Sequence, residues 1–170
     1  MKKTVWVFGL IIGVILCGNM FVMVNMLYNN PDMKTNDVLG YAAMVIMLSL
    51  IFFGGRNYRN KYLGGFISFG RALKTGVLIA LVGCALYVVV WLFYYYLFVP
   101  DFLDKYTAHV LRHCTPGDLA EKTKEMEDFR KMYQNPAFVA LTTFAEVFPI
   151  GLMVALISAF LLKRKRKDTK

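Results

Sequence analysis

Residues 68–100 read SFGRALKTGVLIALVGCALYVVVWLFYYYLFVP, and this stretch decides the fold class. After Arg71 and Lys74, an uncharged run extends from Thr75 to Val99. About 25 residues at ~1.5 Å per residue exceed the ~30 Å thickness of the hydrocarbon layer, so the run predicts a membrane-spanning helix. Ser68 is a good helix N-cap, and we expect the helix to begin before the hydrocarbon does.

Three further apolar runs are long enough to span a bilayer, and 58% of the chain is hydrophobic, above the value usual for soluble domains. The predicted spans cover residues 4–28, 38–54, 72–99 and 137–162. A basic loop is expected over residues 54–61, and residues 101–135 are expected to form a helical hairpin outside the membrane. The sequence therefore predicts an all-α integral membrane protein, a four-helix bundle in which residues 1–170 form one membrane domain.

The positive charges predict the orientation of the spans. If both termini and the loop between spans two and three are cytoplasmic, that side carries 13 of the 20 lysines and arginines. The other side then carries seven, together with nine acidic residues. Since positive charge is retained in the cytoplasm, we expect both termini there and the hairpin outside. The net charge of +9 is thereby explained by topology, and no nucleic-acid partner is expected.

Small residues recur every four positions in three of the spans. This spacing places each set on one helix face, where small side chains allow the close backbone approach that joins helices in a membrane. These residues are predicted to mediate helix packing in the cytoplasmic half of the bundle, while aromatic residues fill the outer half: Gly9, Gly13 and Cys17; Gly76, Ala80 and Cys84; Gly151, Ala155 and Ala159.

Glu146 is the acidic residue that lies within a predicted span, close to the middle of the bilayer. A carboxyl group at this depth costs about 2.5–3.5 kcal/mol, so it is expected to face the protein interior or water. Pro149 cannot donate a hydrogen bond to the carbonyl of Ala145, which leaves a free acceptor nearby. Asn19 falls at a similar depth, and Trp91 and Tyr94 lie at or slightly outside it. We therefore expect an intramembrane polar site in which Glu146 contacts Asn19, capped by Trp91 and Tyr94.

Two roles for Glu146 follow from the sequence. It could be a proton or ion site that opens outward, since acidic residues within spans are usually functional. It could instead be a structural hydrogen-bonding group that holds the fourth span to the first. A single carboxyl group without a second charged partner makes a poor relay, which favours the structural role.

Other chemical motifs are weak. His109 and His113 are four residues apart and could share a metal ion, but no firm third ligand accompanies them, so no metal site is expected. The chain has no nucleophile elbow, phosphate-cradling loop or dinucleotide fingerprint. Neither a cofactor nor an enzymatic activity is expected.

Several segments together resemble a known family: residues 64–76, Pro100-Asp101-Phe102, Asn135-Pro136, Phe148-Pro149-Ile150-Gly151 and Leu162-Lys163-Arg164-Lys165. The chain is similar over most of its length to an uncharacterised family of four-span membrane proteins common in Bacteroidota, known as domain of unknown function 4199. The resemblance implies a bacterial inner-membrane protein and supplies no activity.

Two functional classes remain open. The first is a small structural, accessory or interaction protein of the inner membrane, which forms a homo-oligomer or binds an envelope complex through the hairpin and the small-residue faces. The second is a proton- or ion-coupled carrier of small solutes that uses Glu146.

The orientation can be tested with reporter fusions. A reporter that is active only in the cytoplasm should be active after residue 170, and one that is active only outside should be active within residues 114–118, because lysine and arginine are concentrated at the termini and in the loop between spans two and three. The opposite pattern would invert the topology.

Overall fold

The computed structural model describes residues 1–30, 32 and 37–164. It consists of seven helices: α1 (Lys2–Asn29), α2 (Asp37–Leu48), α3 (Leu50–Tyr62), α4 (Phe69–Leu97), α5 (Phe102–His113), α6 (Leu119–Met132) and α7 (Pro136–Leu162). Four helical segments are long and apolar enough to cross a membrane: Lys2–Asn29, Val38–Tyr62, Phe69–Leu97 and Pro136–Leu162. The predicted all-α, four-span bundle is confirmed.

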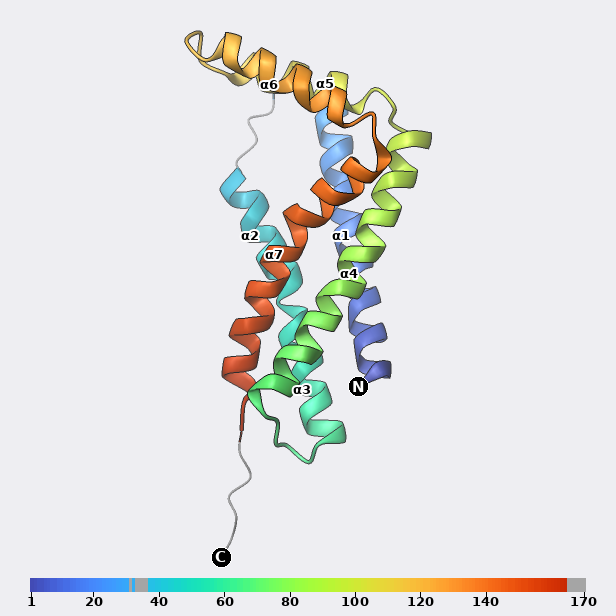
Figure 1. Cartoon of the computed structure of the whole chain (residues 1–170), viewed down its shortest axis with the longest axis vertical. Coiled ribbons are helices and arrows are strands. Elements are labelled where there is room, and N and C mark those ends of the chain that lie inside the picture. Colours follow the sequence, from blue (N-terminus) through green and yellow to red (C-terminus); the bar gives the residue numbers. More distant parts are fainter. Residues whose placement is uncertain (31, 33–36, 165–170) are drawn as a thin grey trace, which may run out of the picture.

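The long helix α4 lies at the centre of the bundle, with α1 along one side and α7 along the other (Figure 1). The second span is divided at Ser49, whose hydroxyl donates a 2.6 Å hydrogen bond to the carbonyl of Ile46. Its second part, α3, packs against α1, α4 and α7, while α2 packs mainly against α7 and α1. The two halves of this span therefore make different contacts.

The predicted basic loop at residues 54–61 is wrong, because these residues belong to helix α3. Gly54 and Gly55 are buried packing positions. A Cβ atom on Gly54 would lie 2.6 Å from Ile79 Cδ1, and one on Gly55 would lie 2.7 Å from Leu162 Cδ1. The chain reverses later, at Gly64 and Gly65, whose φ angles of 61° and 87° require glycine.

The core consists of tight contacts between small residues and larger neighbours. A Cβ atom on Gly9 of α1 would lie 2.6 Å from Val82 Cβ, and one on Gly76 of α4 would lie 3.0 Å from Ala155 Cβ of α7. Around these contacts lie side chains with no exposed surface, among them Ile12, Ile79 and Ala80. Helix α4 is therefore held closely to both of its neighbours.

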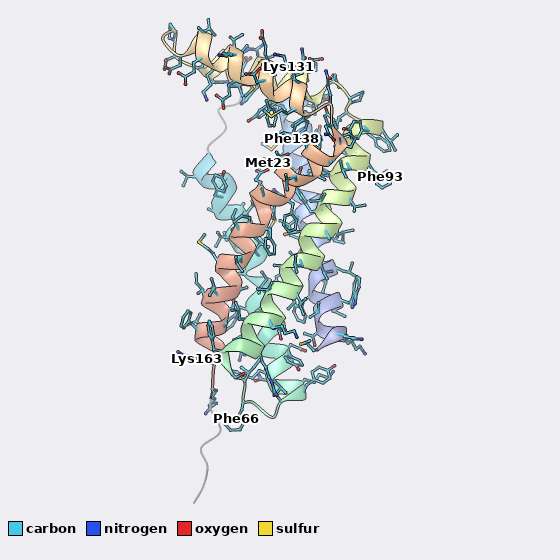
Figure 2. All side chains as sticks on the ribbon, in the orientation of Figure 1. Met23, Phe66, Phe93, Lys131, Phe138 and Lys163 are labelled. Carbon is cyan, nitrogen blue, oxygen red and sulfur yellow. The ribbon has the colours of Figure 1, made fainter. Side chains whose placement is uncertain are left out.

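The start of α1 and the end of α7 lie at one end of the bundle, and α5 and α6 cross the opposite end (Figure 1). We call the first the basic end, because Lys2, the end of α3 and Lys163 lie there, and the second the hairpin end (Figure 2). At the basic end, Ile67 and Arg164 exchange two backbone hydrogen bonds of 3.2 and 2.9 Å. This bridge ties the turn before α4 to the end of α7.

Two glycines on α1 provide a matched test of this packing. Gly9→Ala should destabilise the protein by about 1–3 kcal/mol, because the added methyl group meets the Cβ atom of Val82, which cannot move without the backbone of α4. Gly18→Ala adds the same methyl group where no atom lies within 4 Å, so it should leave stability unchanged or increase it. Thermal unfolding in detergent measures both, and equal midpoints for the two variants would contradict the packing described.

Candidate functional site

Glu146 lies in α7, about 15 Å along the helix from its first residue, Pro136, which places it near the middle of a ~30 Å hydrocarbon layer. The start of α7 is fixed by Asn135, whose Oδ1 atom accepts a 3.0 Å hydrogen bond from the backbone N–H of Ala137. The side chain of Glu146 is exposed. The carboxyl group was expected to face either the protein interior or water, and the exposed side chain is not enclosed by the bundle.

Polar side chains in the neighbourhood of Glu146 form no hydrogen bond with its carboxyl group. Tyr87 of α4 and Tyr133, which follows α6, lie within electrostatic range of Glu146. Thr142, one turn earlier on α7, donates instead to the carbonyls of its own helix, at 2.9 Å from that of Phe138. Among residues 1–30, 32 and 37–164, no hydrogen bond to the Glu146 carboxyl group is formed.

The predicted contact between Glu146 and Asn19 is not formed within the described part of the chain. Asn19 is half-buried on α1, and α1 and α7 both pack along α4 rather than along each other. Two residues at similar depth are therefore separated because α4 occupies the central position. The residue between the two helices is Tyr87, which lies within electrostatic range of both Glu146 and Cys17.

Trp91 and Tyr94 belong to a large aromatic cluster at the hairpin end. Trp91 is 6% exposed, and its ring lies 5.0 Å from that of Phe102 in α5, in an edge-to-face arrangement. Tyr94 makes the same kind of contact with Phe21 of α1 at 4.7 Å. These aromatic residues tie α1, α4 and α5 together rather than cap a polar contact.

Tyr133 extends this cluster from α6 toward Glu146. It is 7% exposed, and its ring lies 5.4 Å from that of Tyr95. Burial raises the pKa of its hydroxyl group, and Trp91 and Thr143 lie close enough to interact with that group. The phenol is therefore neutral at physiological pH and available as a hydrogen-bond donor or acceptor.

Sequence reasoning missed Tyr87 as a neighbour of Glu146. The signal was present, since Tyr87, Trp91 and Tyr95 follow one another at intervals of four residues and so share one face of α4. We expected aromatic residues in the outer half of the bundle, with Trp91 and Tyr94 over the polar contact, whereas Tyr87 lies one turn deeper than Trp91.

Helix α7 continues through Pro149, which is exposed on its surface. Proline has no N–H group, so the carbonyl of Ala145 loses its usual helical donor beside the exposed carboxyl group of Glu146. Two hydrogen-bond acceptors thus lie close together on one part of α7. A side chain of another molecule that binds beside Glu146 and Ala145 would therefore need to supply hydrogen-bond donors.

The nine small residues predicted to mediate helix packing are all buried: Gly9, Gly13, Cys17, Gly76, Ala80, Cys84, Gly151, Ala155 and Ala159. Their neighbours belong to this same chain. A Cβ atom on Gly13 would lie 2.7 Å from Leu86, and one on Gly151 would lie 3.1 Å from Ala80. These faces are occupied within the bundle and leave no room for another helix.

The rings of His109 and His113 are neighbours on α5, with centroids 4.5 Å apart. Nδ1 of His113 lies 2.9 Å from the carbonyl oxygen of His109, and His109 is 6% exposed. Over the described residues, no group of three or more His, Cys, Asp or Glu side chains is arranged to hold a metal ion.

The arrangement around Glu146 has a defined chemistry. An exposed carboxyl group at mid-bilayer depth, beside a tyrosine and a proline-freed carbonyl, can accept hydrogen bonds from a partner or can bind a proton. Either a hydrogen bond from a partner or protonation would reduce the free-energy cost of placing the Glu146 carboxyl group in the hydrocarbon layer.

The chain was compared with protein families, curated sequences and solved structures. No similar protein was found among curated sequences, and no similar fold among solved structures. Residues 7–164 match the family described as "Protein of unknown function (DUF4199)". Because this match covers nearly the whole chain, the protein belongs to the DUF4199 family.

Proposed function

We propose that the chain is an accessory or interaction protein of the bacterial inner membrane, with both termini in the cytoplasm, which binds a partner at the exposed part of α7 around Glu146. The observation that carries this proposal is the exposed Glu146 carboxyl group, which has no hydrogen-bond donor among the described residues. A carboxyl group in hydrocarbon costs about 2.5–3.5 kcal/mol, and a donor from another helix offsets that cost. The proposal includes no catalytic step.

The internal packing of the bundle supports this choice of surface. Our expectation that small-residue faces bind the partner is not retained, because Gly76 and Gly151 pack against Ala155 and Ala80 of the same chain. A partner helix must therefore use other positions. The part of α7 around Glu146 offers two hydrogen-bond acceptors, the carboxyl group and the carbonyl of Ala145.

The partner is either a second copy of the chain or another membrane protein. In a homo-oligomer, a protonated Glu146 of one copy could donate to the carboxylate of the other. In a complex with a different protein, a Ser, Thr, Asn or basic side chain would supply the donor. The helices α5 and α6 lie at the hairpin end of the same bundle and provide a second surface that such a partner could contact.

A carrier that uses Glu146 as a proton or ion site is the alternative. A carrier needs a path from Glu146 to the basic end, and side chains with no exposed surface fill that half of the bundle, among them Ile12, Ile51 and Ile79. This dense packing favours the interaction protein.

Photo-crosslinking in membranes tests the proposal. A benzoylphenylalanine at Ala145, beside Glu146, should give one discrete crosslinked product. The same group at Phe93, which projects from α4 away from the bundle (Figure 2) and is 64% exposed, is the matched control and should give none. Glu146→Leu should lower the association by about 5–30-fold, the value of one interhelical polar contact, whereas Glu146→Gln keeps a hydrogen-bonding group and should lose less.

Equal crosslinking from both positions, or association unchanged in Glu146→Leu, would contradict the proposal. Proton flux in liposomes separates it from the alternative. A pH-dependent flux that disappears in Glu146→Gln while crosslinking persists would establish the carrier instead.

A further inference from the structure

A groove of about 550 Å³ lies at the basic end of the bundle, between α1 and α3. Phe8 of α1 lines one side, and the other lining residues come from α3: Phe53, Arg56, Asn57, Asn60 and Lys61. It is far from Glu146 along the bundle and is independent of the function proposed above.

The five residues from α3 form a single stripe. Counted from Phe53, the others follow at three, four, seven and eight positions, the spacing that places residues on one helix face. The stripe is apolar at its inner end, at Phe53, and becomes polar and cationic over the next two turns toward Lys61. Gly54 allows this arrangement, because a Cβ atom there would lie 3.1 Å from the ring of Phe8.

The polar part of the groove presents hydrogen-bond donors and positive charge. Arg56 and Lys61 are exposed and form no ion pair with any described residue. Asn60 accepts a 2.9 Å hydrogen bond at Oδ1 from Nε of Arg59, so its NH₂ group remains available as a donor. Arg59 itself turns toward α7, where Nη1 lies 3.3 Å from the carbonyl of Leu162. An anionic group rich in acceptors, such as a phosphodiester, matches this lining.

The apolar part of the groove distinguishes a lipid from a soluble phosphate. Phe53 is 50% exposed although it belongs to the span Val38–Tyr62. Deeper in the membrane, Ile11 of α1 and Ile46 of α2 remain 44% and 71% exposed. Ile11 follows Phe8 by three residues and so shares its face of α1, which extends the apolar surface inward from the groove, as acyl chains attached to a headgroup at Arg56 require.

We propose that this groove binds one anionic phospholipid from the leaflet on the side of the termini, with its phosphate between Arg56 and Lys61 and its acyl chains over Phe8 and Phe53. The surroundings support a negative ligand, since the described residues of the basic end include no Asp or Glu. The bound lipid would fill the space between α1 and α3 and join the two helices.

The test uses the full-length protein in detergent with added phosphatidylglycerol, and measures bound lipid by native mass spectrometry and the thermal midpoint in parallel. The double variant Arg56→Gln/Lys61→Gln should bind phosphatidylglycerol about 30-fold more weakly than the unchanged protein, since each basic residue contributes about a fivefold factor near an anionic headgroup. Phosphatidylcholine, which has no net charge, should bind the unchanged protein weakly.

The double variant Arg71→Gln/Lys74→Gln is the matched control. It removes the same charge from exposed positions at the same end, outside the groove, and should retain binding within about threefold, because charge near a headgroup acts mainly at short range. An equal loss in both double variants would show a general attraction to the surface and would overturn the proposal.

The acyl-chain contact has its own test. Phe53→Ala should weaken phosphatidylglycerol binding by several-fold while the protein still elutes as a single species, because Phe53 is half exposed and its removal leaves the core intact. Glycerol 1-phosphate, which carries a phosphate without acyl chains, should raise the thermal midpoint far less than the lipid does. Equal stabilisation by both ligands would assign the groove to a soluble phosphate and would contradict a lipid.

Discussion

The close approach of α4 to α1 and α7 is the constraint on which the rest of the structure depends. Hydrocarbon gives no hydrophobic force between helices, so packing and polar contacts must hold them. At Gly9 and Gly76 the absence of a side chain brings backbones into contact range of Val82 and Ala155. As a consequence of this packing, α4 separates α1 from α7, and Glu146 on α7 is left exposed.

The two ends of the bundle are stabilised by different interactions. At the hairpin end, edge-to-face aromatic contacts such as Trp91–Phe102 are joined by polar contacts, including a 2.6 Å hydrogen bond from Tyr28 to Asp101 and an ion pair between Arg130 and Asp104. At the basic end, backbone pairing and small residues hold the helices, and the described cations there form no ion pair. A charged ligand therefore has a matching surface at the basic end.

The four long apolar helices and the position of Glu146 along the fourth could be predicted because both depend on counting residues along a helix. The contact between Glu146 and Asn19 could not, because depth carries no information about which helices are neighbours. The prediction of a loop at Gly54-Gly55 was wrong for a related reason. A glycine pair followed by polar residues is typical of turns in soluble proteins, whereas in a membrane the same residues allow helices to touch. The positions of Phe8 and Ile79 beside Gly54, and of Leu162 beside Gly55, distinguish the two.

The backbone bridge between Ile67 and Arg164 has a consequence for biogenesis. It joins the turn before the third span to a residue that follows the fourth span. Until α7 is synthesised and inserted, the contacts of Gly76 with Ala155 and of Ala80 with Gly151 cannot form. The first three spans therefore form an incomplete intermediate in the membrane, and the basic end assembles only after the fourth span has been synthesised and inserted.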